Sequence, residues 1–83
     1  MRVLYFAWLR ERVGHAEEEV APPAEVRTVA DLARWLAGRS ESHAHAFANP
    51  AVVRAALDRR HVKLDAELGT AREIAFFPPM TGG

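Results

Sequence analysis

The sequence predicts an α+β domain in which helices pack on one face of a mixed sheet. Three observations support this prediction. Hydrophobic, strand-like segments stand near both ends of the chain, at residues 2–9 and 73–77, and a strongly amphipathic helical segment lies between them at residues 28–38. The predicted elements follow in the order strand, strand, helix, strand, strand, strand. A chain of 83 residues forms one domain with a small core.

The segment from Arg2 to Leu9 is rich in aromatic and branched residues, which favour a strand. Because side chains alternate along a strand, Val3, Tyr5 and Ala7 share one face and Leu4, Phe6 and Trp8 share the other. Both faces are apolar, which indicates either a central strand covered on both sides or a docking surface on one side. A helical turn over residues 9–13, ended by Gly14, and an exposed, charged edge strand over residues 17–20 are expected next.

The helix over residues 28–38 has clear boundaries. Thr28 is a typical N-cap, and Asp31 three residues later completes a capping box in which Asp replaces the usual Glu. The next apolar residues fall at i, i+3, i+4 and i+7, and they are Val29, Leu32, Ala33 and Leu36. The helix is expected to end at Gly38. A second, short helix is predicted from a cap at Ser42 through Phe47.

The last third of the chain predicts three strands. Residues 52–57 and 61–64 form a hairpin-like pair around a turn at residues 58–60, and residues 73–77 form the final strand. In that strand Ile74 and Phe76 share one face, whereas Ala75 and Phe77 share the other. The first and last strands are the most hydrophobic, so we expect them side by side in the centre, with Phe6 and Phe77 close together on the face away from the helix.

Composition excludes several kinds of chemistry. The formal net charge is zero, so net charge gives no support for binding nucleic acid or an anionic membrane. The absence of cysteine excludes disulfides, thiolate metal sites and a cysteine nucleophile on this chain. His43 and His45 lie at i, i+2, a spacing that does not place two side chains on one helix face, so no metal site is expected. No stretch resembles a signal peptide or a membrane span, and the expected location is the cytoplasm.

The C-terminal stretch is the most informative part of the sequence. Two consecutive glycines, Gly82 and Gly83, end a random chain by chance about once in 200 sequences. They follow a hydrophobic strand and two prolines, Pro78 and Pro79, which fix φ and favour an extended exit. Residues without a Cβ can thread a narrow channel at little steric cost. We therefore expect a domain over residues 1–78 and a flexible tail over residues 79–83 that presents its carboxylate.

The two ends of the chain resemble the MoaD family, the small sulfur-carrying subunits of molybdopterin synthase. The C-terminal residues carry the likeness in the run Ala75-Phe76-Phe77-Pro78-Pro79-Met80-Thr81-Gly82-Gly83, and the N-terminal residues carry it in Val3-Leu4-Tyr5-Phe6-Ala7 with Leu9-Arg10-Glu11 and Gly14. The resemblance implies a ubiquitin-like β-grasp fold. Two stretches depart from the family pattern, at residues 57–58 and 70–73, and both concern turn geometry.

The resemblance also implies a function. A ubiquitin-activating-like adenylyltransferase would use ATP to adenylate Gly83, which would then become a thiocarboxylate and donate sulfur to a pterin precursor, cyclic pyranopterin monophosphate. That precursor would be held by the large subunit of molybdopterin synthase in a heterotetramer. The chain itself would be non-catalytic and would bind no cofactor. The tail residues Met80 and Thr81, with Gly82, Pro78 and Pro79, would enter the partner. We expect Phe6 and Phe77, with Arg10 on the rim, to form the patch that docks both partners.

Other interpretations stay open. Related carriers serve thiamine synthesis or tRNA thiolation, and a ubiquitin-like modifier would join its terminus to lysines of other proteins. A diglycine-ended binding domain without chemistry is a fourth alternative. Phe6 and Phe77 could also be ordinary core residues, because strand facing is easily displaced by one position, and Arg10 could be a solvated surface charge.

Overall fold

The computed structural model describes residues 1–79. The first half of the chain forms β1 (Arg2–Tyr5), α1 (Ala7–Val13), β2 (Glu17–Glu19) and α2 (Val29–Ala37). The second half forms α3 (Glu41–Ala46), the 3-10 helix η1 (Pro50–Val52), β3 (Arg54–Leu57), β4 (Arg60–Val62) and β5 (Glu73–Phe77). The strands make one sheet in the order β2-β1-β5-β3-β4.

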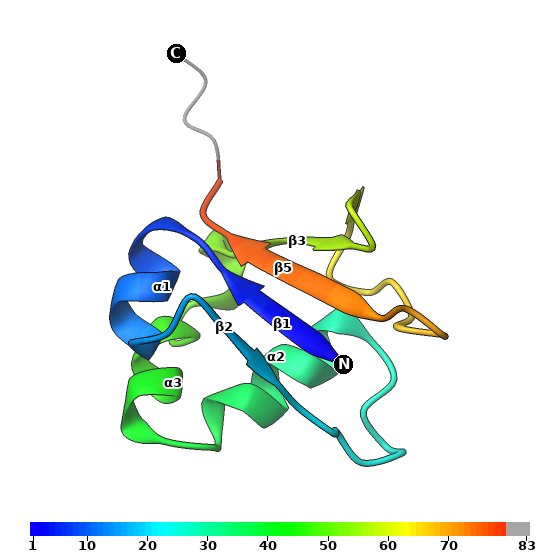
Figure 1. Ribbon diagram of the computed structural model, residues 1–83, viewed down its shortest axis with the longest axis horizontal. Helices are drawn as coiled ribbons and strands as arrows, with labels where there is room; N and C mark the ends of the chain where they lie inside the picture. Colours follow the sequence, from blue (N-terminus) through cyan, green and yellow to red (C-terminus); the bar gives the residue numbers. More distant parts are fainter. Residues whose placement is uncertain (80–83) are drawn as a thin grey trace.

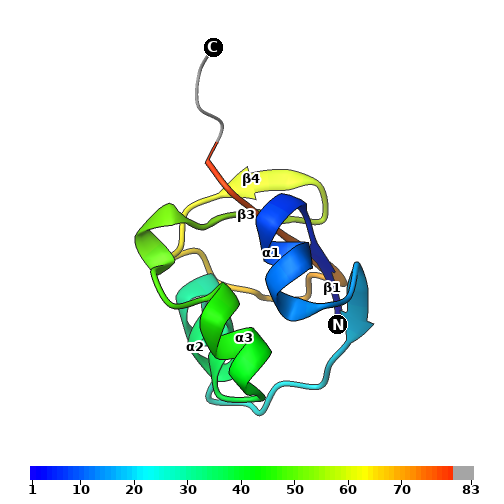
Figure 2. The same ribbon diagram turned by 90° about the vertical axis from the view of Figure 1, so that its left-hand side faces the viewer.

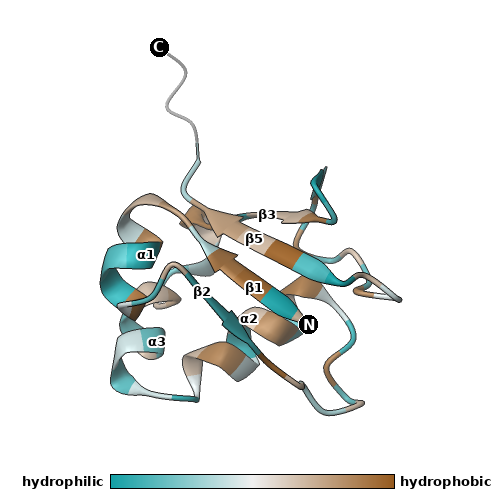
Figure 3. Cartoon of the chain, viewed as in Figure 1, coloured by the Kyte–Doolittle hydropathy of each residue, from teal (hydrophilic) through white to brown (hydrophobic). Residues whose placement is uncertain are grey.

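The first and last strands lie side by side, as predicted, and β5 occupies the centre of the sheet (Figure 1). β1 and β5 run parallel, with Val3 opposite Ile74 and Tyr5 opposite Phe76. The remaining pairs, β1 with β2, β3 with β5 and β3 with β4, are antiparallel. β1 and β5 consist largely of apolar residues, whereas the edge strand β2 is hydrophilic (Figure 3). The sheet is therefore mixed, with its most hydrophobic strands protected from the edges.

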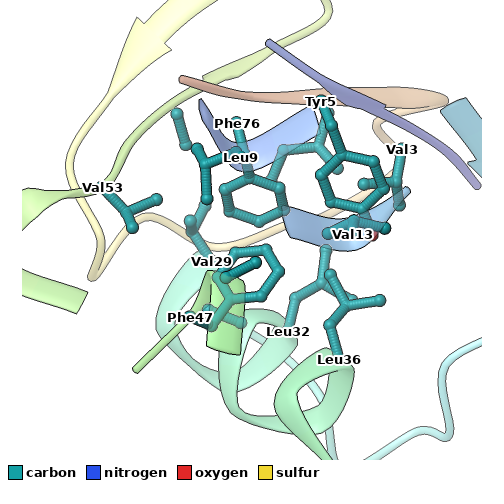
Figure 4. Packing of buried hydrophobic residues seen from close by; sticks show 14 of the residues in the cluster. Val3, Tyr5, Leu9, Val13, Val29, Leu32, Leu36, Phe47, Val53 and Phe76 are labelled. Carbon is teal, nitrogen blue, oxygen red and sulfur yellow. The ribbon is translucent and has the colours of Figure 1, made fainter. Parts of the chain in front are cut away.

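The core lies between the sheet and the helices, which cover the same face (Figure 2). From the sheet, Tyr5, Ile74 and Phe76 are at most 1% exposed, and the α2 residues Leu32 and Leu36 are fully buried. Aromatic rings pack together in the middle of the core (Figure 4). The Phe76 ring lies 5.0 Å from the Phe47 ring, edge to face, and 6.4 Å from the Tyr5 ring in a stacked arrangement. The predicted facing of β5 and the apolar stripe of α2 are confirmed.

The first strand is shorter than predicted. It ends at Tyr5, and α1 begins at Ala7 and ends where expected, at Gly14. Ala7 makes the bend with φ +53°, a conformation that costs a residue with a Cβ roughly 1–2 kcal/mol. The bend turns Leu9 and Val13 into the core, where both are buried. The prediction of strand faces that include Ala7 and Trp8 was therefore wrong.

The boundaries around the second helix also differ. The capping box of Thr28 and Asp31 and the end of α2 at Gly38 are confirmed. However, the N-cap of α3 is Ser40 and not Ser42, since the Ser40 Oγ accepts the backbone N–H of His43 at 3.1 Å. β3 begins at Arg54, two residues later than predicted, because the Asn49 side chain caps the intervening 3-10 turn.

A polar network ties the edge strand to the third helix. The Glu18 carboxylate accepts the Tyr5 hydroxyl and lies 2.7 Å from His43 Nε2, and His43 Nδ1 lies 2.7 Å from the Ser40 Oγ. Burial raises the pKa of the Tyr5 hydroxyl, and its hydrogen bond to Glu18 adds to that effect. Burial also disfavours the charged form of Glu18, yet the hydrogen bonds from His43 and Tyr5 outweigh it and hold the pKa of Glu18 below its ordinary value. The exposed, charged strand predicted from the sequence thus has an inward-facing middle residue.

Acid should weaken this network. A carboxyl whose pKa is lower in the folded chain stabilises the fold above its unfolded pKa, and the contribution disappears as the pH falls through the folded value. We expect Glu18→Gln to lower the free energy of unfolding by about 1.5–3 kcal/mol at pH 7, and the difference from the wild type to shrink below about pH 4.5. Urea unfolding at several pH values measures both. Glu17→Gln, at an exposed position of the same strand, is the matched control; a pH-independent deficit in Glu18→Gln would contradict the expectation.

Candidate docking surface and carboxyl-terminal exit

An apolar depression of about 780 Å³ opens where β5 leads into the C-terminal residues. We call it the exit surface. Its lining residues are Phe6, Ala7, Ala56, Arg59, His61, Ala75, Phe77, Pro78 and Pro79. They come from the junction of β1 and α1, from the β3–β4 hairpin and from β5 with the two prolines that follow it, segments that the sheet brings together. A surface of this kind, mostly apolar and next to a polar rim, is typical of a protein interface.

Two phenylalanines from neighbouring strand ends dominate the exit surface. Phe6 is 49% exposed, the highest value among the large hydrophobic residues in the described part of the chain. Its backbone N–H donates to the Phe76 carbonyl at 3.1 Å, which continues the β1–β5 ladder by one step. Phe77 is half-buried and follows the buried Phe76, so alternation directs it to the opposite face. Both residues line the exit surface, which agrees with the prediction that they lie near each other; their contact with a partner stays a prediction.

The hairpin adds two basic residues that sequence reasoning did not assign to the site. The His61 ring lies 5.1 Å from the Phe77 ring, and Arg59 lines the same depression. The turn residues Asp58 and Arg59 both have positive φ, at +45° and +71°. Alternation could have found His61, because the β3–β4 register places it opposite Ala56, which also lines the exit surface. Arg59 had no such signal, since a turn of charged residues is ordinarily solvated.

The other predicted contact residues divide into two groups. Pro78 and Pro79 are half-buried and line the exit surface directly after β5. Arg10 is exposed on α1 and is not among the lining residues, so its place on the rim stays a prediction. Met80, Thr81, Gly82 and Gly83, with most of the predicted flexible tail, lie outside the described residues.

The described residues present few candidates for other chemistry. Within residues 1–79, no group of three or more His, Cys, Asp and Glu side chains is placed to hold a metal ion. His43 instead belongs to the network with Ser40 and Glu18. In the same part of the chain, no helix has the length and apolar character needed to cross a membrane. The exit surface, lined by the last described residues Pro78 and Pro79, therefore stays the candidate site.

A mixed five-stranded sheet with helices on one face, in a chain whose sequence ends in two glycines, is typical of a small ubiquitin-like β-grasp protein. Comparison with known families identifies which one. The chain belongs to the ThiS family, whose model matches residues 3–83.

Two curated relatives match the full length of the chain. The molybdopterin synthase sulfur carrier subunit of Escherichia coli is 40% identical over 83 residues, which cover 100% of this chain and 99% of the relative. The molybdopterin synthase sulfur carrier subunit of Mycosarcoma maydis is 31% identical over 87 residues, covering 100% of this chain and 92% of the relative. The resemblance to sulfur-carrier subunits inferred from the two ends of the sequence is thus confirmed along the whole chain.

Solved structures confirm the predicted fold. A putative molybdopterin converting factor, subunit 1, from Pyrococcus furiosus superposes with a TM-score of 0.72 at 31% identity, covering 94% of each chain. SAMP1 from Haloferax volcanii superposes with the same TM-score at 24% identity, covering 100% of this chain and 98% of the other. The second likeness bears on the fold alone.

Proposed function

We propose that this chain is the sulfur-carrier subunit of molybdopterin synthase and acts in molybdenum cofactor biosynthesis. The observation that carries the proposal is the full-length match to the sulfur carrier subunit of Escherichia coli, 40% identical over 83 residues. The exit surface supports it, because a carrier must dock its partners beside the terminus that it delivers. The chain is a subunit without catalytic groups of its own, and the acids, bases and metals of the reaction belong to its partners.

The terminal chemistry follows from the properties of a carboxylate, which is a poor electrophile and carries no sulfur. An adenylyltransferase would join the Gly83 carboxylate to the α-phosphate of ATP, releasing pyrophosphate. A sulfur donor would then displace AMP and leave one sulfur in place of one oxygen. The resulting thiocarboxylate is a better nucleophile than the carboxylate, and it would attack the pterin precursor bound by the large subunit. Two such transfers would build a dithiolene.

The residues of this chain serve delivery. Pro78 and Pro79 restrict the backbone where the tail leaves β5, which lowers the entropy lost when the tail is ordered in a partner. Gly82 and Gly83 have no side chain to obstruct a narrow channel. Phe6 and Phe77 anchor the large subunit and, at another stage, the adenylyltransferase. We propose a heterotetramer of two small and two large subunits, located in the cytoplasm with the ATP-dependent partner.

Intact-mass measurement tests this function directly. The chain is incubated with ATP, a sulfur source and an adenylyltransferase of proven activity. We expect a mass gain equal to the difference between sulfur and oxygen, because one carboxylate oxygen is replaced. The Gly83 deletion should show no gain. A wild-type chain that gains nothing, while a control carrier in the same reaction does, would contradict the proposal.

The acceptor separates this function from its alternatives. The thiocarboxylate chain, mixed with the large subunit and the pterin precursor, should lose its sulfur and form the dithiolene product. A chain that gains sulfur but transfers it only to a thiamine or tRNA acceptor would belong to another thiolation pathway. Isopeptide-linked adducts on lysines of other proteins would favour a protein modifier.

A further inference from the structure

We propose that the exit surface recognises a segment of the large subunit in which a carboxylate stands beside an apolar anchor, and that Arg59 and His61 bind that carboxylate. The inference rests on the proposed function, in which this surface docks the large subunit. It adds a determinant of specificity, because an apolar surface alone accepts many partners.

Charge complementarity points to an acidic partner. Among the described lining residues of the exit surface, Arg59 and His61 are the groups that can carry positive charge, and none of the lining residues is Asp or Glu. The nearest acidic residue in sequence, Asp58, is already engaged, because its carboxylate accepts the backbone N–H groups of Arg72 and Glu73 at 3.1 and 3.0 Å. An incoming carboxylate would therefore meet no acidic side chain of the described lining.

The polar side of the hairpin carries charges of both signs. Arg59 also lines an adjoining polar depression of about 680 Å³, which includes Glu19, Asp58 and Glu73 together with Arg2 and Arg72. Glu19 pairs with the N-terminal amine at 2.8 Å. The cations and carboxylates of this second depression are mixed, so it has no single preferred charge. The exit surface, by contrast, favours a negatively charged group.

The backbone holds both basic residues in place. The Asp58 backbone N–H donates to the Glu73 carbonyl at 3.0 Å, and with the two bonds to the Asp58 carboxylate this fixes the turn on the start of β5. β4 then pairs with β3 so that His61 lies against Phe77. A charged group held in advance loses less entropy on binding than a free side chain does.

Arg59 occupies a position where its residue type is unfavourable. At φ +71° a residue with a Cβ is strained, and glycine or asparagine is preferred in such hairpin turns. The chain keeps an arginine there at a cost in stability. A strained residue beside a binding surface supports a functional role for its side chain.

The experiment measures the affinity of the full chain for the purified large subunit at low and high salt. We expect Arg59→Gln to weaken binding about tenfold at low salt and to flatten the salt dependence, because a lost charge pair removes the screened contribution. We expect His61→Gln to weaken binding several-fold. Arg60→Gln is the matched control. It removes the same charge one residue away, at an exposed position opposite Leu57 that does not line the exit surface.

A second variant separates docking from folding. Arg59→Gly relieves the strained φ, so we expect its Tm to rise while its affinity for the large subunit falls about tenfold, as in Arg59→Gln. If the wild type binds the large subunit, and Arg59→Gln and His61→Gln bind it with the same affinity and salt dependence, this inference is overturned. The proposed function would then stay intact. A wild-type chain that does not bind the large subunit would overturn the proposed docking, and this inference with it.

Discussion

Replacing Phe76 with Ala should lower the free energy of unfolding by about 3–5 kcal/mol, the range observed for deleting a buried aromatic ring. Phe76 is fully buried on the central strand and contacts the rings of Tyr5 and Phe47. Native domains are stable by only about 5–15 kcal/mol, and small ones lie at the lower end. The variant should therefore be substantially unfolded or unfold in little denaturant. Urea unfolding followed by circular dichroism measures the change.

Phe76→Leu is the control for this expectation. It keeps an apolar side chain in the core and leaves a smaller cavity, so the loss should be clearly less than for Ala. An unfolding midpoint in Phe76→Ala equal to that of the wild type would contradict the packing of the β1–β5 centre described above.

Replacing the next residue, Phe77, with Asp should have the opposite profile. Phe77 is half-buried on the exit surface, so the fold should survive with a small loss of stability. Affinity for the large subunit should fall about 30-fold or more, because a central apolar anchor typically contributes at least 2 kcal/mol and the new carboxylate would be desolvated. Isothermal titration measures the affinity, and thermal unfolding reports on the fold.

Two comparisons make the Phe77 result decisive. Phe77→Leu keeps an apolar group and should retain most of the affinity. If the Phe77→Asp chain still forms the complex, judged by gel filtration and titration, Phe77 does not belong to the interface. Together, Phe76 and Phe77 test the two faces of one strand, the first for folding and the second for docking.

Regular patterns made part of the fold predictable. β5 was predicted with its observed bounds because turn residues precede it, proline follows it, and its apolar residues alternate between faces. α2 was predicted because its stripe and capping box are local signals. The central pairing of β1 and β5 followed from hydrophobicity, since the most apolar strands avoid the edges.

Other features depend on tertiary contacts that no local signal records. The end of β1 at Tyr5 requires a positive φ at Ala7. A glycine at this position would have predicted the bend, but alanine gives no such signal. Ser40 and Ser42 are equally good caps in isolation, and the side chain of His43 favours Ser40 because its ring reaches both Ser40 and Glu18. Glu18 lies in a run of three glutamates, so its inward position is set by its partners and not by its residue type.

The candidate site shows the same division. Alternation placed Phe6 and Phe77 correctly, and the proline pair marked the exit from the sheet. Arg59 and His61 escaped assignment because their approach to the exit surface depends on the turn conformation and the β3–β4 register. Arg10 was predicted on the rim of the docking patch; it is exposed on α1 and does not line the depression, so its role on the rim stays a prediction.

The parallel pairing of β1 with β5 has a consequence for how the chain folds. The contact joins residues 2–5 to residues 73–76, so it closes a loop that includes nearly the whole domain. Such non-local contacts slow folding, because the entropy of loop closure is lost before the contact can stabilise anything. A nascent or clipped chain without β5 would leave the edges of β1 and β3 unpaired and open to other molecules. Correct folding therefore depends on the strand that directly precedes the tail, so damage there would remove the carrier before it could engage a partner.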